Sequence, residues 1–187
     1  MNNTRSKIIE IAKDLIHRVG LNAMSYQHIS DVIGIRKASI HHHFPKKENL
    51  VDELLKDCQI SYGDNYKRIV ESNGSAPEKL RQLAAIFQEG LQKKELCLVG
   101  SISTNLNTLQ PNSSRILEET IQNTVDIFAI TFKQGIAEGS LSFSGTAEEL
   151  AYAFFSFLVG VQITARVNGG VKLFQKSTEA IISGWEK

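Results

Sequence analysis

Hydrophobic residues recur every three or four positions along nearly the whole chain, and the strict alternation of a strand is scarce. This period predicts amphipathic helices. The first helix is expected to end at Gly20, because glycine tolerates the left-handed conformation of a helix C-terminus. Ser25 is placed to cap a second helix, which ends at Gly34. A short third helix is expected from about Lys37 to His43. The residues expected to face inward from these segments are Ile8, Ile11, Ala12, Leu15, Ile16, Val19, Ile29, Val32, Ile33, Ile40 and Phe44.

The same period continues through the remaining residues. A long helix is expected from near Lys47, with an apolar stripe of Leu50, Val51, Leu54, Leu55, Cys58, Tyr62 and Ile69. After a polar linker at residues 72–75, Pro77 suits the first turn of the next helix. Further helices are expected over Cys97–Leu106, through residues 116–132 to near Gly139, and over Ala147–Val167 and Val171–Trp185. The pattern predicts an all-α fold, with an N-terminal three-helix head (residues 1–47) joined by a long helix to a helical body (residues 48–187).

Composition agrees with a folded globular protein. Hydrophobic residues make up 42% of the chain and charged residues 22%, which argues against disorder. The longest apolar run, residues 154–161, is too short to span a bilayer, and the polar N-terminus lacks the apolar segment of a signal peptide. We therefore expect a cytoplasmic protein. Cys58 and Cys97 lie on separate helical patterns without metal-ligand spacing, so neither a disulfide framework nor a zinc site is expected.

The charges are unevenly distributed. Residues 1–47 contain eight Lys and Arg against three Asp and Glu, a net charge of +5. Because the whole chain carries +1, the remainder carries −4. All five histidines also lie within residues 1–47. A basic head on an acidic body is the charge distribution of a nucleic-acid-binding module joined to another function.

The segment from Gly34 to Glu48 combines a tight turn, a very short basic helix and the start of another helix. A helix of barely two turns is unstable alone and must be presented by a scaffold. Its exposed Arg, Lys, Ser and His residues suit the base edges and phosphates of a DNA major groove. A capped helix, a glycine turn and a short basic helix together predict a helix-turn-helix.

This arrangement also resembles a known family. The residues Ser25…Ile29-Ser30-Asp31…Gly34-Ile35…Ser39-Ile40-His41-His42-His43-Phe44…Lys47-Glu48…Leu50 are similar to the signature of the tetracycline-repressor (TetR) family of bacterial transcriptional regulators. The resemblance covers roughly residues 5–55 without a gap. It implies that the groove or its phosphates are contacted by Ser25, Tyr26, Lys37, Ser39, His41 and His42, and that Lys47 binds a phosphate.

Two basic residues depart from the family pattern. Arg36 stands where the family usually has a capping Ser or Thr, and Lys46 stands where it has a small polar residue. A lost cap costs about 1 kcal/mol, and positive charge opposes the helix dipole at an N-terminus. Nearby DNA phosphates would reverse that disadvantage, so we expect both residues to face DNA, Arg36 at a guanine or at a phosphate. The family's usual Tyr is His41 here, which could make DNA binding sensitive to pH near 6.5.

Three adjacent histidines, His41 to His43, raise the question of a metal site. Consecutive helical residues point about 100° apart, so these side chains cannot converge on one ion without outside ligands. No metal and no other cofactor is expected.

A single head is small for specific DNA recognition, and symmetric dimers that bind two half-sites are the usual solution. The resemblance favours a homodimer formed by the last two helices as a four-helix bundle. Part of the apolar stripe is expected to belong to the intramolecular core instead. The candidate dimer residues are Phe154, Phe157, Leu158, Gly160, Val161, Ala165, Ile181, Ile182 and Trp185.

The resemblance also implies an effector pocket between body helices, with ligand binding moving the long connecting helix and spreading the paired heads. Taken singly, each candidate residue is more typical of an ordinary core position than of a pocket wall, and only about a third of them are expected to line the pocket. Few charged residues fall on these faces, so a largely apolar effector is expected. The candidate lining residues are Phe87, Leu91, Cys97, Ile102, Phe128, Phe132, Tyr152 and Phe155.

Cys97 opens an alternative. The segment Glu95-Leu96-Cys97-Leu98-Val99-Gly100 resembles one found in electrophile- and oxidant-responsive members of the family, and a thiol near a helix N-terminus can have a lowered pKa. The competing interpretation is a buried, unreactive cysteine. The same regulator could thus be switched by thiol chemistry instead of a ligand.

The functional prediction is a ligand-responsive transcriptional regulator, a homodimeric repressor released from a palindromic operator by a small apolar effector. An enzyme is not expected, because the sequence has no Ser-His-Asp order, no phosphate-binding glycine loop and no histidine in the body. A helical small-molecule-binding protein without DNA function and an activator are the remaining alternatives.

Overall fold

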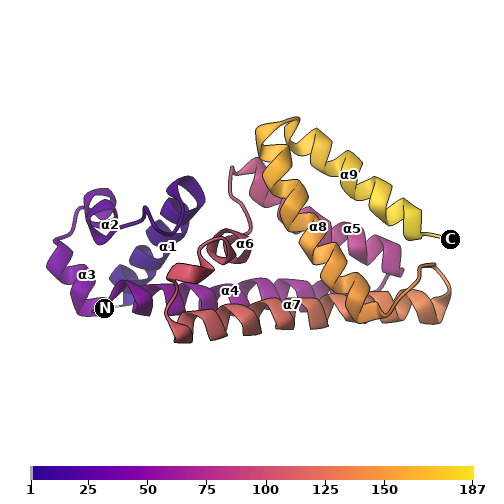
Figure 1. Cartoon of the computed structure of the whole chain (residues 1–187), viewed down its shortest axis with the longest axis horizontal. Coiled ribbons are helices and arrows are strands. Elements are labelled where there is room, and N and C mark those ends of the chain that lie inside the picture. Colours follow the sequence, from indigo (N-terminus) through magenta and orange to yellow (C-terminus); the bar gives the residue numbers. More distant parts are fainter. Residues whose placement is uncertain (1) are drawn as a thin grey trace. The chain divides into compact units, whose positions relative to one another are not determined.

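The computed structural model describes residues 2–187, with side chains from Thr4 onward; residue 1, with which the predicted head begins, lies outside the described residues. The chain is helical throughout (Figure 1). The elements are α1 (Asn2–Val19), α2 (Tyr26–Ile33), α3 (Lys37–His43), α4 (Lys47–Val70), α5 (Ala76–Gln92), α6 (Leu98–Ser103), the 3₁₀-helix η1 (Leu106–Thr108), α7 (Pro111–Glu138), α8 (Ala147–Val167) and α9 (Gly170–Trp185). Within the described residues the nearest approach to a strand is a single bridge between Leu141 and Glu186. The all-α prediction is confirmed.

The helices form two compact units. The first unit contains the chain up to Gln59 together with Leu98–Thr120, and the second contains Ile60–Cys97 together with Ile121–Lys187. Helices α4 and α7 each contribute one part to either unit. The predicted boundary after residue 47 divides the chain by function and stays a prediction, whereas these units are defined by packing.

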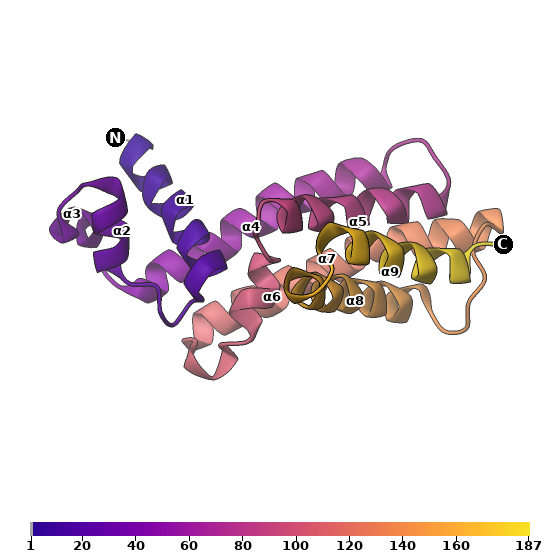
Figure 2. The same ribbon diagram turned by 90° about the horizontal axis from the view of Figure 1, so that it is seen from above.

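In the first unit, local sequence signals set the helix ends as predicted. The Ser25 hydroxyl accepts a hydrogen bond from the His28 backbone N–H at 3.3 Å. Gly20 and Gly34 adopt φ angles of 82° and 76°, which a side chain would strain. The Gly34 N–H closes α2 on the carbonyl of Ser30 at 2.9 Å. These signals fix a compact α1–α2–α3 head (Figure 2).

The core of the first unit contains most of the expected residues. The fully buried side chains include Ile8, Ala12, Ile16, Ile29, Ile40, Phe44, Leu50, Leu54 and Leu55. Two expectations are wrong, since Val19 is 50% exposed and Val32 is 57% exposed. Val19 is the last residue of α1, and Val32 lies on the outer side of a helix only eight residues long.

Polar side chains tie the elements of the first unit together. Arg5 on α1 donates to Glu53 on α4 at 2.9 Å, and its guanidinium lies 5.0 Å from the centre of the Phe44 ring. Lys13 pairs with Asp57 one helical turn further along α4. Asp52 accepts hydrogen bonds from two residues at the start of α7, at 2.6 Å from the Asn112 amide and 2.5 Å from the Ser113 hydroxyl. These contacts fix α1 and the start of α7 on α4.

The segment after Cys97 differs from the expected single helix over residues 97–106. Helix α6 covers only Leu98–Ser103, and the 3₁₀-turn η1 follows it. The Thr108 hydroxyl at the end of η1 donates to the Asn22 side chain at 3.0 Å, between α1 and α2. This tertiary contact, which helical periodicity does not encode, accounts for the difference.

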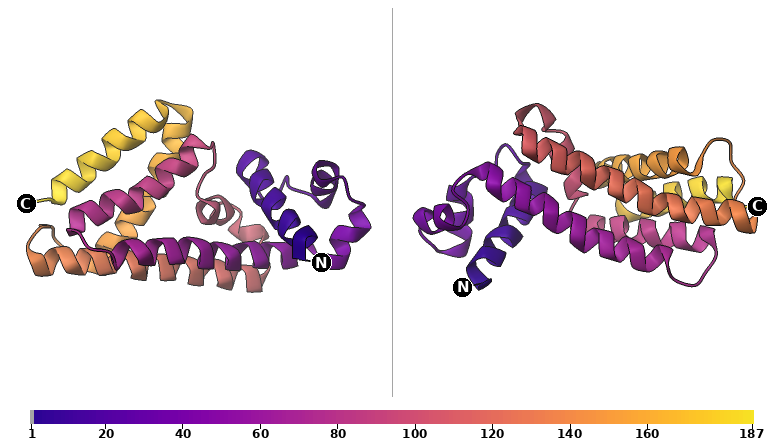
Figure 3. Two further views of the ribbon diagram at one scale, coloured as in Figure 1. Left: turned by 180° about the vertical axis from the view of Figure 1, so that it is seen from behind. Right: turned by 90° about the horizontal axis from the view of Figure 1, so that it is seen from below.

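The second unit packs α5, α8 and α9 together with the later part of α7 (Figure 3). Two capping boxes start its helices, one formed by Ser75 and Glu78 before α5 and one by Thr146 and Glu149 before α8. Two α4 positions differ from the expected stripe: Tyr62 is 37% exposed and Ile69 is half-buried. Tyr66 and Val70 are buried instead.

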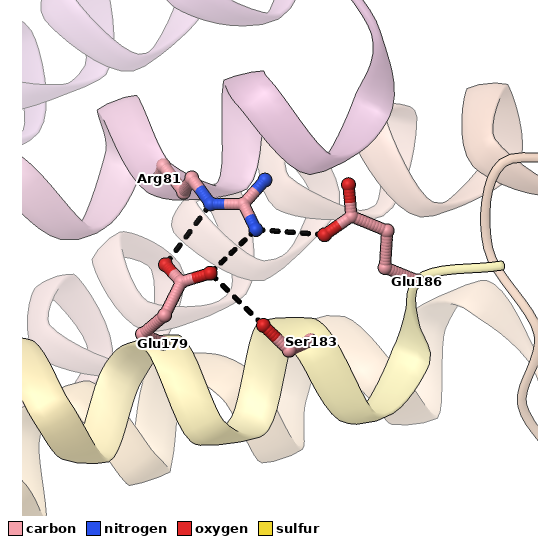
Figure 4. A network of polar contacts seen from close by, with 4 residues as sticks. All are labelled: Arg81, Glu179, Ser183 and Glu186. Atoms are coloured by element: carbon pink, nitrogen blue, oxygen red, sulfur yellow. Dashed lines mark hydrogen bonds and ion pairs between the residues drawn. The ribbon is translucent and has the colours of Figure 1, made fainter.

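An ion-pair cluster joins α5 to α9 (Figure 4). The Arg81 guanidinium donates two hydrogen bonds to the Glu179 carboxylate, at 3.0 and 2.6 Å, and a third to Glu186 at 2.7 Å. Glu179 also accepts a hydrogen bond from Ser183 at 2.9 Å. Direct hydrogen bonding from Arg81 lowers the pKa of Glu179 from its ordinary 4.5 to about 2. The carboxylate therefore stays ionised at any physiological pH.

Helix α8 is the one described helix that is long and apolar enough to cross a membrane by length and composition alone. It extends well beyond the apolar run of residues 154–161 that we judged too short. The core helix of a globular protein passes the same test. Ala151, Phe154, Leu158 and Ala165 of α8 are fully buried within the second unit, as in such a core helix.

Candidate nucleic-acid interface

Helix α3 packs against the rest of the head through its apolar side and exposes its polar side to solvent. Ile40 is completely buried and Phe44, which follows the helix, is 1% exposed. Both were predicted to point inward, and the structure confirms this. The other side of the segment is solvent-accessible and carries the exposed residues Arg36, Lys37, Ser39, His41 and His42. A seven-residue helix cannot persist alone, so these two anchors determine where the exposed residues lie.

Arg36 occupies the N-cap position of α3 in an extended conformation, and its side chain makes no capping hydrogen bond. Lys46, just before α4, is exposed as well. The Lys46 backbone N–H donates to the Asn49 side chain at 3.1 Å, whereas the Lys46 ammonium has no acceptor atom with which to cap the helix. Both side chains are placed as expected for contacts with an anionic partner.

The predicted role of Tyr26 needs correction. Its side chain is 7% exposed, and its hydroxyl donates to the Phe44 backbone carbonyl at 2.8 Å. Burial raises the pKa of the Tyr26 phenol to about 12. The hydroxyl thus fastens the end of α3 to the start of α2 instead of facing DNA. Ser25 is also occupied, by its cap on His28.

Lys47, the predicted phosphate contact, also makes hydrogen bonds within the head. Its ammonium donates to the Leu21 and Met24 carbonyls, each at 2.7 Å, in the loop between α1 and α2. Burial lowers the pKa of Lys47 from its ordinary value. The structure therefore gives Lys47 the task of holding the α1–α2 loop onto the start of α4. A phosphate contact would have to compete with two short hydrogen bonds.

The histidines differ in their surroundings. The Nδ1 atom of His41 lies 3.2 Å from the Pro45 carbonyl oxygen, and its ring meets the Tyr26 ring edge-on at 4.9 Å between centroids. The His42 and His43 rings also meet edge-on, at 5.4 Å. Among the residues with described side chains, no group of three or more His, Cys, Asp and Glu is arranged to hold a metal ion.

Two polar residues in the first turn of α2 that are not among the predicted DNA contacts, Gln27 and His28, are exposed. Both residues precede the buried Ile29, and the Gln27 amide donates to Asp31 at 2.7 Å. The cap at Ser25 was a usable signal, because it fixes which residues form the first turn of this helix.

The predicted effector residues are distributed over both units. Phe87, Leu91, Phe128, Phe132 and Phe155 are buried in the second unit, whereas Ile102 is buried in the first. Tyr152 is 55% exposed, and Cys97 is half-buried.

Stacked and edge-on aromatic rings form a continuous cluster in the second unit. The Phe87 ring lies 6.2 Å from Phe155 and 6.4 Å from Tyr66, which the sequence analysis did not single out as a lining residue. Phe128 contacts Tyr66 and Phe155 at 5.1 and 6.3 Å. The interior of the second unit is thus apolar and rich in aromatic side chains at most of the positions predicted for the effector.

A separate groove of about 440 Å³ lies on the outside of α5 and α9. None of the predicted effector residues lines it. Three charged residues, Arg81, Lys176 and Glu179, line it, and Arg81 and Glu179 are paired with each other. Its lining residues are Arg81, Ala84, Ala85, Gln88, Phe174, Gln175, Lys176, Thr178 and Glu179.

Several predicted dimer residues are buried in the core of a single chain, which is the alternative left open for part of this apolar stripe. Phe154, Leu158 and Ala165 are completely buried and Val161 is 8% exposed, so their own chain already covers them. Ile182 is buried in the same way. Gly160 is exposed, and Phe157, Ile181 and Trp185 are half-buried. Helix α8 also exposes three large apolar side chains, Tyr152, Ile163 and Val167.

Comparison with known proteins agrees with this geometry. The family profile described as bacterial regulatory proteins, tetR family, matches residues 8–54. The HTH-type transcriptional repressor KstR2 of Mycobacterium tuberculosis (strain H37Rv) is 29% identical over 140 residues, which cover 74% of this chain and 70% of that protein.

Two solved structures share the fold. A TetR-family transcriptional regulator from Agrobacterium tumefaciens superimposes with a TM-score of 0.94 at 26% identity, over 100% of this chain and 99% of the other. The ketosteroid transcriptional regulator KstR2 of Mycobacterium tuberculosis superimposes with a TM-score of 0.76 at 24% identity, over 100% and 97% of the two chains.

A capped α2, a glycine turn and an anchored basic α3 define a helix-turn-helix DNA-binding protein. The profile match, the KstR2 relative and the A. tumefaciens structure carry the assignment further. The chain carries, at residues 8–54, the helix-turn-helix head of the TetR family of bacterial transcriptional regulators, as its sequence signature predicted. It is a DNA-binding regulator of transcription and not an enzyme.

Proposed function

We propose that this regulator is a homodimeric repressor, which binds a palindromic operator through α3 and is released by a small, largely apolar effector in the second unit. The observation that carries the proposal is the exposed Arg, Lys, Ser and His side of α3, held in place by buried Ile40 and Phe44. We also propose that the protein acts in the cytoplasm, where its operator lies.

Within the interface, Arg36, Lys37 and Ser39 are the proposed base-reading residues, because they occupy the exposed start of α3. Arginine and lysine pair with guanine edges, and serine bonds to several bases. Lys46 is the proposed phosphate contact. His42 is exposed on the same helix and is the proposed contact at its end.

The effector proposal is supported by the aromatic cluster around Phe87, Phe128 and Phe155. Pockets with such linings favour apolar ligands. The relative KstR2 is described as a ketosteroid transcriptional regulator, and a ketosteroid is a largely apolar ring system. We propose an effector of similar polarity, without assigning its structure.

The proposed dimer surface is the exposed side of α8, around Gly160 and Ile163, together with the half-buried Trp185 of α9. Its test is Ile163→Glu, with Ile136→Glu on α7 as the matched control. Both isoleucines are about half exposed, at 42% and 53%. Sedimentation velocity is expected to show a monomer only for Ile163→Glu. A dimer that survives this change, or one disrupted equally by both, would contradict the proposed surface.

The decisive experiment for DNA recognition is selection from random duplex DNA, with the bound pool sequenced. A palindromic motif is expected, with half-sites about one helical turn apart. Lys37→Ala and Ser39→Ala should change the preferred sequence, whereas Lys46→Ala should weaken binding to all sequences. Equal and nonspecific losses from all three variants would contradict the assigned roles. An unenriched pool from folded protein would contradict operator binding itself.

A second candidate mechanism keeps the DNA-binding head and replaces the effector by thiol chemistry at Cys97. It is favoured by one observation: Cys97 is half-buried, whereas Cys58 is 1% exposed. Operator release by a mild oxidant should then be lost in Cys97→Ser while DNA binding is kept. Release that persists in this variant would rule out the thiol mechanism.

A further inference from the structure

Gln162 is a polar residue in the apolar interior of the second unit. It lies in the C-terminal half of α8, is 2% exposed, and uses both ends of its amide. Its Nε2 atom donates to the Phe87 carbonyl at 2.7 Å, and its Oε1 atom accepts from the Cys97 backbone N–H at 2.6 Å. One side chain therefore joins α8 to the end of α5 and to the loop that follows it.

The loop that Gln162 holds is tightly built. The Glu95 N–H bonds to the Gly90 carbonyl at 2.8 Å, and Lys94 adopts a left-handed φ of 64°. A Cβ atom added to Gly90 would lie 3.1 Å from the Gln162 Nε2 atom and 3.2 Å from the Glu95 carbonyl oxygen. Glycine at this position permits the close approach of α5, the loop and Gln162.

Cys97, at the end of this loop, is the last residue of the second unit before the chain passes into the first. The next residue, Leu98, begins α6. Within the first unit, this following segment is bonded to the α1–α2 loop through Thr108 and Asn22, and to α4 through Ser113 and Asp52. A displacement of Cys97 is therefore passed along the chain to a segment that packs with the DNA-binding head.

At its other end, Gln162 bonds to Phe87, whose ring lies in the aromatic cluster with Tyr66 and Phe155. This cluster is where we propose that the effector binds. Movement of Phe87 would act on the same amide that holds Cys97. A buried amide that lost one hydrogen-bond partner would be left unsatisfied. The Phe87 carbonyl and the Cys97 N–H, which both bond to this amide, are therefore favoured to move together.

We propose that Gln162 is a positioning residue that couples the aromatic interior of the second unit to the DNA-binding head, through the Cys97 backbone. The inference rests on the proposed function and adds the residue through which regulation passes. Because coupling between two sites is reciprocal, DNA bound to the head must in turn affect the loop at residues 93–97. This allows a test in which operator DNA, obtained by the selection above, is the only ligand.

The experiment measures amide hydrogen exchange over residues 93–103, and the alkylation rate of Cys97 by peptide mass spectrometry, with and without operator DNA. Both rates in the unsubstituted protein are expected to fall about fivefold or more on DNA binding, the lower end of typical coupling. In Gln162→Met, operator binding should persist while this response is lost. Thr131→Val is the control, because it removes a fully buried hydroxyl that has no hydrogen-bond partner.

Gly90→Ala is a second variant that disturbs the same contact without changing Gln162. Alanine favours the helix, so folding should be retained while the DNA-dependent response is weakened. Its control is Gly63→Ala in α4, where an added Cβ meets nothing within 4 Å.

Each outcome is decisive. A response that is lost in Gln162→Met, weakened in Gly90→Ala and kept in both controls supports the inference. A response that survives in both test variants overturns it, and so does an unsubstituted protein that binds operator without any change in residues 93–103. The result with the unsubstituted protein does not depend on whether any variant folds, and it leaves the proposed function intact. Failure of the unsubstituted protein to bind any operator would overturn the proposed function itself.

Discussion

Lys47 offers the sharpest test of how the head is assembled, because sequence and structure give it different roles. The TetR-like signature places it at a DNA phosphate. In the structure its ammonium donates to the Leu21 and Met24 carbonyls at 2.7 Å each. Lys47→Met removes the charge and keeps most of the side-chain length, so it separates the two roles.

The expected loss of stability follows from these bonds. A hydrogen bond from a charged group contributes about 1.5–3 kcal/mol, and a neutral one about 1 kcal/mol. Removal of both bonds sets an upper limit near 6 kcal/mol. Two effects reduce it: the half-buried ammonium regains hydration on unfolding, and the loop around exposed Asn22 lets water reach the abandoned carbonyls. We therefore expect a loss of about 2 kcal/mol.

The assay combines urea denaturation with the salt dependence of operator binding. Lys46→Met is the matched control, because Lys46 is exposed and adjacent in sequence. It should change the free energy of unfolding by less than about 0.5 kcal/mol and make the salt slope shallower by about 1. Lys47→Met should lower stability and leave most of the salt slope unchanged. Unaltered stability with a shallower slope in Lys47→Met would refute the loop role and restore the phosphate contact.

Three further predictions follow from single contacts. Tyr26→Phe removes the buried hydrogen bond to the Phe44 carbonyl. Urea denaturation should show that the free energy of unfolding falls by about 1 kcal/mol. DNA selection should show an unchanged sequence preference. Lys79→Met removes a 5% exposed ammonium that closes the end of α4, so the same assay should show a loss of about 3 kcal/mol. The pKa of Glu179 is lowered to about 2 by Arg81, so the folded state binds fewer protons than the unfolded state between pH 4.5 and 2. The contribution of the Arg81–Glu179 pair to stability is complete above pH 4.5 and is lost as the pH falls toward 2. Glu179→Gln should therefore flatten the fall in Tm over this range. An unchanged dependence of Tm on pH would contradict the assignment.

Features that depend on neighbouring residues could be predicted from the sequence. The cap at Ser25, the left-handed glycines at 20 and 34, and the inward Ile40 each follow from residues within one or two helical turns. The sequence signature also identified the family. These local rules were sufficient for the head and for most helix boundaries.

The roles of Tyr26 and Lys47 could not be predicted in this way. Their partners are backbone carbonyls 18 to 26 residues away in the chain. Every residue carries such a carbonyl, so the side-chain pattern contains no sign of which one will be used. Both residues fall within the family signature, but the signature does not distinguish a contact with DNA from a contact that shapes the DNA-binding surface.

Helix α8 shows a second limit. Its apolar residues surround much of the helix, and a single sequence does not reveal which side faces its own chain. Phe154 and Leu158 were assigned to the dimer surface, yet they pack inside the second unit, with Phe154 near Phe128, Phe132 and Trp185. The exposed side of α8 became evident only from the fold.

Three polar side chains of this protein, Lys47, Lys79 and Gln162, share one arrangement, which indicates where regulation should be sought. Within an α-helix the backbone groups satisfy each other, so unpaired carbonyls and N–H groups concentrate at helix ends and in loops. Lys47, Lys79 and Gln162 all bond to such groups: a loop carbonyl, the last carbonyl of α4, and the amide before α6. Each thereby fixes the position of one helix relative to its neighbour. Substitutions in the apolar core reduce the stability of a whole unit. Substitutions at these polar contacts instead remove the bond that fixes one helix relative to its neighbour. Variants that fold and bind DNA but no longer respond to a signal should therefore be found at the polar contacts rather than among the phenylalanines.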